Sequence, residues 1–142
     1  MSVSKFVGDQ RGEIITASRG DSVAAVVALL ASRRIGCVPI VEDERVLGIF
    51  SERDVIYGLQ REGAALLDKS VGDVMTAPAV TIERDTPILS ALSLMTQRRV
   101  RHLPIVERGR LIGFVSIGDL VKSRMDRIET EAEAMRSYIQ SA

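Results

Sequence analysis

The chain has 142 residues, of which 46% are hydrophobic and only 4% aromatic, so it can bury one aliphatic core or two small ones. Its 19 lysines and arginines balance 19 aspartates and glutamates, which excludes the charge excess typical of nucleic-acid binders and of proteins that dock on anionic membranes. The single cysteine excludes an internal disulfide. Because the sequence also has no apolar signal core and no membrane-length apolar run, we expect a cytoplasmic protein that binds neither nucleic acid nor membrane.

An ungapped repeat organises the sequence. Residues 15–56 and 80–121 are identical at 13 of 42 positions, with a constant offset of 65 residues. In each copy a short extended segment precedes a polar break, an amphipathic helix, a β-hairpin and a second helix, which predicts β-α-β-β-α twice. We expect first strands at 13–17 and 79–82, and hairpin strands at 37–41, 46–50, 102–106 and 111–115.

The polar breaks before the first helices contain residues typical of helix starts. Asp21 and Thr86 are the predicted N-caps, and Pro87 fits a first helical turn. Between the copies, residues 57–70 indicate a helix followed by a loop, and residues 71–78 a short helix followed by a turn. We therefore place the first repeat at residues 5–65 and the second at residues 71–124.

The remaining residues, 125–142, form a predicted helical extension. From the end of the second repeat, apolar residues follow a 4-3-4-3-4 spacing, which is a heptad pattern. They are Val121, Met125, Ile128, Ala132, Met135 and Ile139. This helix either packs back on its own domain or contacts another subunit. We favour the subunit contact because residues 129–142 extend beyond the repeat that they would cover.

Each copy ends in the same short motif. Gly48-Ile-Phe-Ser51-Glu-Arg-Asp54 and Gly113-Phe-Val-Ser116-Ile-Gly-Asp119, each preceded by Pro-Ile-Val, resemble the pattern of the cystathionine-β-synthase (CBS) domain. The resemblance covers residues 5–122. It implies an α+β fold in which two β-α-β-β-α repeats pack through their sheets about a pseudo-twofold axis, with a C-terminal helix added. It also implies a homodimeric regulatory module that needs no cofactor, binds AMP, ADP, ATP, S-adenosylmethionine or NAD(H), and controls a protein that the sequence does not name.

The Ser-x-x-Asp spacing has two interpretations. It can be a capping box, in which the serine and the acid satisfy the free amides of a helix start. It can also hold a sugar-phosphate, because a helix start attracts phosphate and a carboxylate accepts from ribose hydroxyls. Gly48 and Gly113 would then permit close approach to the ligand. With the resemblance added, we favour nucleotide binding.

The resemblance further implies two clefts, each combining the Ser-x-x-Asp end of one copy with the early strands of the other. Cleft A would be formed by Ile49, Ser51, Arg53, Asp54, Ala79, Val80, Val100, Arg101 and His102. Cleft B would be formed by Ile14, Ile15, Asp21, Ile35, Gly36, Cys37, Phe114, Ser116, Gly118 and Asp119.

The clefts differ at matched positions. Cleft A has Arg53, Arg101 and His102 where cleft B has Gly118, Gly36 and Cys37. We therefore expect cleft A to prefer the more phosphorylated ligand and cleft B to be roomier. The other repeated arginines, at positions 33, 34, 98 and 99, are interpreted mainly as solvated helix ends.

Other function classes have weaker support. One histidine and one cysteine are too few for a zinc site, and no Gly-rich phosphate loop or serine-hydrolase elbow occurs. Cys37 and His102 are equivalent residues of the two copies, so we do not interpret them as a catalytic dyad. We expect a binding module with no enzyme activity. A partner-binding scaffold with degenerate clefts and, less favoured, a small nucleotide-acting enzyme stay open.

Overall fold

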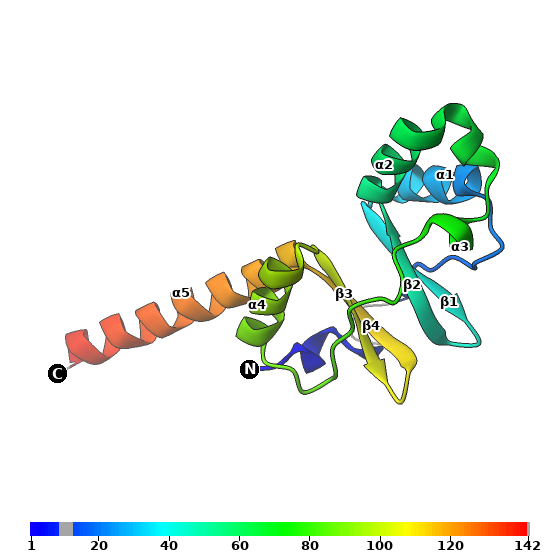
Figure 1. The fold of residues 1–142 in the computed structure, drawn as a ribbon. Helices are drawn as coiled ribbons and strands as arrows, with labels where there is room; N and C mark the ends of the chain where they lie inside the picture. Colours follow the sequence, from blue (N-terminus) through cyan, green and yellow to red (C-terminus); the bar gives the residue numbers. More distant parts are fainter. Residues whose placement is uncertain (9–12, 142) are drawn as a thin grey trace.

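Figure 1 shows the α+β fold of a computed structural model that describes residues 1–8 and 13–141. Apart from the first strand of each repeat, the repeated elements follow the predicted order. The helices are η1 (Val3–Phe6), α1 (Val23–Arg33), α2 (Glu52–Glu62), η3 (Gly63–Asp68), α3 (Val71–Val74), α4 (Ile88–Arg98) and α5 (Ile117–Ser141), where η marks a 3-10 helix. The strands are β1 (Cys37–Glu42), β2 (Arg45–Ser51), β3 (His102–Glu107) and β4 (Arg110–Ser116).

The hairpins of the two repeats join into one four-stranded sheet in the order β1-β2-β4-β3. Both hairpins carry a register shift at equivalent positions, as expected of a structural repeat. The hairpins meet where Arg45 of β2 pairs with Arg110 of β4, and the Leu111 N–H donates to the Glu44 carbonyl at 2.8 Å. The strand order is symmetric about this contact, so the predicted pairing of two repeats through their sheets is confirmed.

The predicted first strand of each repeat is reduced to one bridge. Ala17 pairs in parallel with Ile40, and Ile82 pairs in parallel with Ile105. These segments are short because a polar turn follows each one at once. The Asp21 N–H donates to the Ser18 carbonyl at 3.0 Å in the first of these turns.

The predicted helix caps are wrong by one residue. Ser22 is the N-cap of α1 and accepts from the Ala25 N–H at 3.1 Å, and Pro87 is the N-cap residue of α4. Asp21 instead accepts from the Ser18 N–H at 2.9 Å, and the Thr86 hydroxyl oxygen accepts from the Glu83 N–H at 3.1 Å. Both side chains thus stabilise the turn before the helix.

Each repeat borrows apolar residues from outside its own sequence range. Val3, Phe6 and Val7 pack in the core of the second repeat, around Leu103, Ile105 and Leu120. In return, Val71 packs in the core of the first repeat. The backbone follows the same exchange, since Val7 bridges to Gly113 and Thr76 bridges to Ile49. The limits at residues 5–65 and 71–124 stay a prediction for the repeats themselves, but the hydrophobic cores do not follow them.

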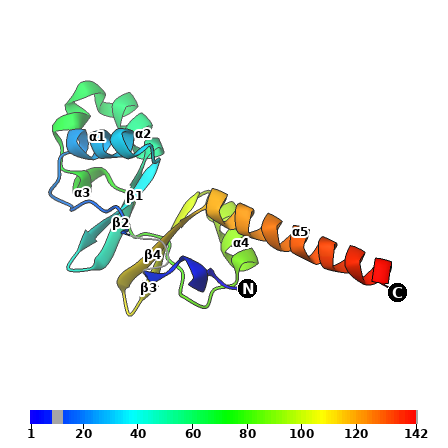
Figure 2. The same ribbon diagram turned by 180° about the vertical axis from the view of Figure 1, so that it is seen from behind.

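The last helix leaves the body of the protein. Its first turns pack beside α4, where Leu120 is fully buried, and Figures 1 and 2 show the rest projecting away from the sheet. The predicted helical extension is therefore present up to Ser141, and Ala142 lies outside the described residues. The alternative in which this helix packs back on its own domain fails for its outer half.

Candidate functional site

Two cavities lie between the repeats, close to the starts of β1 and β3. The first has a volume of about 530 Å³ and includes the start of α2, as predicted for cleft A. The second has a volume of about 430 Å³ and includes the start of α5, as predicted for cleft B. Gly36, Cys37 and His102 line both cavities, so the two clefts meet at the first residues of β1 and β3.

Most residues predicted for cleft A line the first cavity. They are Ile49, Ser51, Arg53, Asp54, Val100, Arg101 and His102. Ala79 and Val80 do not line it, and Val80 packs against the core of the second repeat. The wall of this cavity also includes residues that we did not predict for either cleft. They are Glu52, Ile56, Tyr57, Thr76, Arg98 and Arg99.

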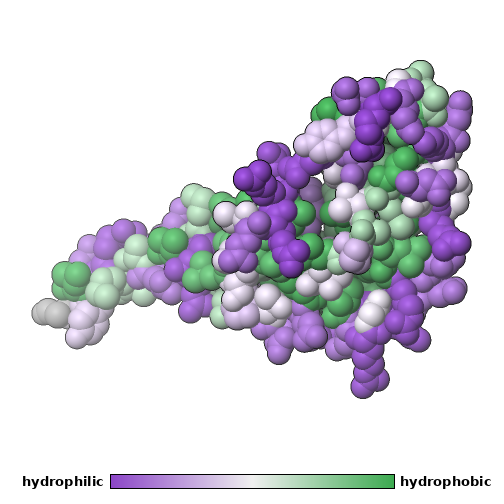
Figure 3. Space-filling view, in the orientation of Figure 1, coloured by the Kyte–Doolittle hydropathy of each residue, from purple (hydrophilic) through white to green (hydrophobic). Residues whose placement is uncertain are grey.

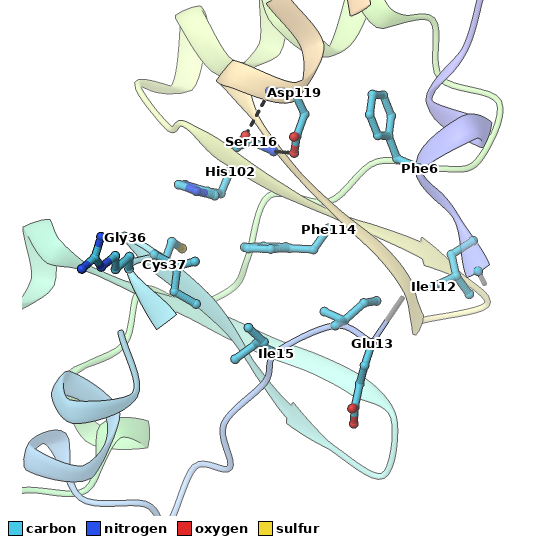
Figure 4. Close-up of a pocket in the computed structure, with 14 residues that line it drawn as sticks. Phe6, Glu13, Ile15, Gly36, Cys37, His102, Ile112, Phe114, Ser116 and Asp119 are labelled. Carbon is cyan, nitrogen blue, oxygen red and sulfur yellow. Dashed lines mark hydrogen bonds between the residues drawn. The ribbon is translucent and has the colours of Figure 1, made fainter. Parts of the chain in front are cut away.

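Eight of the residues predicted for cleft B line the second cavity. The residues found are Ile14, Ile15, Ile35, Gly36, Cys37, Phe114, Ser116 and Asp119. Asp21 and Gly118 are absent from its wall, and Asp21 belongs instead to the turn before α1. The unpredicted residues are Phe6, Gly8, Glu13, Arg34, His102 and Ile112. Figure 4 shows Phe114 and His102 between the Ser116–Asp119 helix start and Cys37 of the other repeat.

The two Ser-x-x-Asp motifs cap their helices in related ways. The Ser116 N–H donates to Asp119 Oδ2 at 2.9 Å, and the Asp119 N–H donates to Ser116 Oγ at 3.1 Å. The Ser51 N–H likewise donates to Asp54 Oδ2 at 2.9 Å. The next amide is used as well, since Glu52 donates to the Gly36 carbonyl at 3.0 Å. The capping interpretation is therefore correct for this arrangement, and it leaves few amides at the helix start for a phosphate.

The aspartate of cleft A makes one contact outside its own motif. Thr76, which comes from the segment between the repeats, donates through its hydroxyl to Asp54 Oδ1 at 2.8 Å. Asp54 is thereby held by the helix start and by the connecting segment together. No repeat signal identifies Thr76 in the sequence, because its function depends on a segment that crosses onto β2.

The role expected for Gly48 and Gly113 is wrong. Both permit close approach, but what approaches is the protein's own backbone. A Cβ at Gly48 would lie 2.5 Å from the Thr76 carbonyl oxygen, and a Cβ at Gly113 would lie 2.7 Å from the Phe6 carbonyl oxygen. The two glycines therefore permit the exchanged segments to pair with β2 and β4, and they do not leave space for a ligand.

The wall of cleft A has an excess of positively charged side chains, and the wall of cleft B has an excess of negatively charged ones. Four arginines and two carboxylates line cleft A, whereas one arginine and two carboxylates line cleft B. The cations of cleft A also support each other's position, since Arg53 donates from a guanidinium nitrogen to the Arg99 carbonyl at 2.8 Å. Three of the four arginines interpreted as solvated helix ends are thus also cavity residues. Two of these, Arg34 and Arg99, end α1 and α4 in the left-handed conformation, at φ values of 53° and 55°.

The two titratable residues among those shared by the clefts, Cys37 and His102, do not behave as charged groups. Burial lowers the pKa of His102, with opposing contributions from Asp119 and Glu52, so its ring favours the neutral form. The ring stacks on Phe114 at 5.5 Å between centroids. Burial, together with the charges of Asp54 and Glu52, raises the pKa of the Cys37 thiol to about 12. Our expectation that His102 adds a phosphate partner to cleft A is therefore not supported.

The expectation that cleft B is roomier is also wrong. Cleft B is smaller than cleft A by about 100 Å³, the difference between 530 and 430 Å³. The glycine expected to open it, Gly118, does not reach the cavity, and the rings of Phe6 and Phe114 occupy part of its wall. No cluster of three or more metal-ligating side chains occurs among the residues that the structure describes.

Comparison with known proteins agrees with this architecture. The sequence profile of the CBS domain matches residues 7–61 and 71–126, which together make up more than half of the chain. The chain belongs to the CBS domain family. The α+β fold with two CBS repeats, predicted from the motif, is thereby confirmed.

Relatives of this CBS pair include proteins of similar size and longer ones. The chain is 31% identical over 134 residues to the mitochondrial CBS domain-containing protein CBSX3 of Arabidopsis thaliana; this match covers 91% of the chain but only 65% of CBSX3. The CBS-domain protein ATU1752 of Agrobacterium tumefaciens has a TM-score of 0.79 at 35% identity, covering 87% of this chain and 92% of that one. CBSX2, solved in complex with AMP, has a TM-score of 0.76 at 25% identity, covering 88% and 96%.

Proposed function

We propose that this CBS pair is a regulatory module that binds adenosine-containing ligands in two inequivalent clefts. The supporting observation is that each cavity combines a Ser-x-x-Asp helix start with apolar residues of the opposite repeat. A ligand with a flat base at one end and a sugar-phosphate at the other matches that distribution of groups. The structural relative CBSX2 binds AMP, which supports the ligand class.

In cleft A, side chains hold the phosphates and the helix amides contribute little. The first amides of α2 already donate to Asp54 and to the Gly36 carbonyl, so the guanidinium groups provide most of the donors for phosphate oxygens. Asp54 accepts from the ribose hydroxyls after it exchanges its contact with Thr76. The excess of arginine favours a polyphosphate such as ATP or ADP.

In cleft B, aromatic side chains provide more of the ligand contacts than they do in cleft A. Phe114 and neutral His102 provide a stacked pair next to Ile15 and Ile35, against which adenine or a second flat ring packs. Asp119 and Glu13 disfavour additional phosphates by charge repulsion. This cleft therefore suits AMP or the less charged parts of NAD(H).

Two arginines that line the clefts, Arg34 and Arg99, have the left-handed conformation, and this supports a ligand role. That conformation costs a side-chain-bearing residue about 1–2 kcal/mol, and glycine would adopt it without cost. Arg34 and Arg99 occupy it at equivalent positions, each beside its own cleft. A contribution to ligand binding accounts for arginine at a position where glycine is more stable.

As part of the same proposal, the module carries no enzyme activity, needs no cofactor, assembles as a homodimer, and passes its ligand state to a separate regulated protein. A thiol with a pKa of about 12 is a poor nucleophile, which argues against chemistry at Cys37. No helix that the structure describes is long and apolar enough to cross a bilayer. The cytoplasmic location stays a prediction.

Calorimetric titration of the chain with AMP, ATP and NADH tests the proposal, with Arg99→Gly and Arg34→Gly as a matched pair. We expect ATP affinity to fall at least tenfold in Arg99→Gly, while Arg34→Gly keeps the ATP site. Both variants should be at least as stable as the parent. No binding of any of the three at millimolar concentration would refute the proposal and favour a partner-binding scaffold.

A further inference from the structure

The outer part of α5 carries an apolar stripe that the body of the protein does not cover. Figure 3 shows hydrophobic residues along this projecting helix. Met125, Ile128, Met135 and Ile139 are 56%, 49%, 60% and 66% exposed. Large apolar side chains at this spacing are typical of a helix face that is buried in an assembly.

The spacing of the stripe indicates that another helix buries it. Written as a heptad abcdefg, the a positions are Met125, Ala132 and Ile139, and the d positions are Val121, Ile128 and Met135. Beyond Leu120 the helix carries four cations and four carboxylates, so it has no basic face for an anionic membrane. A narrow a/d seam between mixed charges is the pattern of a helix that pairs with a helix.

The charges beside the seam indicate which helix pairs with α5 and whether the two helices run parallel or antiparallel. Arg124 and Glu131 occupy g positions, and Glu129 and Arg136 occupy e positions. In a parallel, in-register pair, each g residue faces the e residue five positions later on the other helix. Arg124 then faces Glu129 of the second copy, and Glu131 faces Arg136. Every such pair is attractive, and each occurs twice by symmetry.

An antiparallel pair of the same length would be repulsive. It places Glu129 against Glu129, Glu131 against Glu131, and Lys122 against Arg136 of the second copy. Sliding the antiparallel pair by one heptad restores attraction but leaves only four of the six a and d residues of each helix in contact. The parallel arrangement alone combines the full seam with complementary charges.

We propose that α5 pairs in parallel and in register with α5 of a second copy of this chain. The pair places both bodies at the same end of the seam and extends from Val121 to Ile139. This inference does not depend on nucleotide binding, and neither cleft contributes to the pair. The ion pair between Arg127 and Glu131 within one helix, at 3.0 Å, is compatible with it because Arg127 lies at an outer c position.

Light scattering coupled to size-exclusion chromatography tests the pairing on the full chain. We expect a mass of two copies for the parent and of one copy for Ile128→Lys/Met135→Lys at the same concentration. Ser137→Lys adds a charge at the outer f position and should keep two copies. Circular dichroism and the melting temperature of each variant verify that the body is folded. A two-copy mass for the double variant, a one-copy mass for the parent, or a mass above two copies would overturn the proposal.

Disulfide crosslinking tests the direction. With oxidised glutathione as the oxidant, Ile139→Cys should form a covalent dimer within minutes, since parallel pairing places the two a-position thiols opposite each other. Ser137→Cys, on the outer face, should crosslink at least tenfold more slowly. The native Cys37 is 3% exposed and adds little background. Equal rates for the two variants, or no covalent dimer of the Ile139→Cys variant, would refute parallel pairing.

Discussion

Replacing Asp54 by alanine separates the structural and the binding contribution of the Ser-x-x-Asp motif. The side chain accepts from the Ser51 N–H at 2.9 Å and from the Thr76 hydroxyl at 2.8 Å. Loss of a helix-start interaction costs about 1 kcal/mol. Loss of the hydroxyl contact costs about 0.5–1 kcal/mol, at the low end of its range because Thr76 is exposed and regains water.

The unfolding free energy should therefore fall by about 1.5–2 kcal/mol, which corresponds to a melting temperature lower by about 4–8 °C in a chain of this length. Urea unfolding measures the first quantity and calorimetry the second. Thr76→Val should show only the smaller part, about 0.5–1 kcal/mol, because it keeps the helix-start contact.

Ligand titration of the same variant gives the decisive comparison. Asp54→Ala should lose the ATP site of cleft A, whereas Asp119→Ala should keep it and weaken the site of cleft B. If Asp54→Ala binds ATP with unchanged affinity while its stability falls by the expected amount, Asp54 is a helix cap only, and the ribose contact in our proposal is wrong.

Three further predictions follow from single residues. Because burial lowers the pKa of His102 below 6.5, the unfolded chain binds more protons than the folded chain as the pH falls through that value. Chemical denaturation should show stability decreasing from about pH 7.5 to about 5.5, and His102→Asn should reduce that slope; an unchanged slope would contradict the assignment. Gly48→Ala should lower the unfolding free energy by about 1–3 kcal/mol, since its Cβ would lie 2.5 Å from a carbonyl oxygen, while Gly20→Ala, with nothing within 4 Å, should change it by less than about 1 kcal/mol. Cys37 should react with a thiol reagent about 1000-fold more slowly than free cysteine at pH 8, because a thiol pKa near 12 in place of 9.0 reduces the thiolate by that factor; comparable rates would show that the thiol is neither buried nor perturbed.

Local patterns predicted the elements well. The hairpins and the helix starts at Ser51 and Ser116 depend on alternation and capping within a few residues, and both recur with an offset of 65 residues. The exposed heptad of α5 was predicted for the same reason, because its spacing is a property of one helix. Repetition made the hairpin and helix-start signals visible twice.

The errors concern residues whose positions depend on distant segments. Phe6 and Thr76 reach the clefts by crossing onto the opposite repeat, and neither has a repeat counterpart that marks it. Gly48 and Gly113 were correctly singled out, but what approaches them is backbone from those same segments. The relative sizes of the clefts were predicted wrongly because the size of a residue affects a cavity only if the residue faces it. Gly118 was expected to widen cleft B, but it does not line that cavity.

The exchange of segments between the two cores constrains how the chain is made. During synthesis the first repeat completes its core once Val71 and the residues around it have left the ribosome. Val3, Phe6 and Val7 emerge before the first repeat, yet their apolar partners Leu103, Val115 and Leu120 are made only with the second repeat. The segment that carries Val3, Phe6 and Val7 must therefore stay exposed until the second repeat has been made, and a nascent chain that stalls after the first repeat would present it to chaperones.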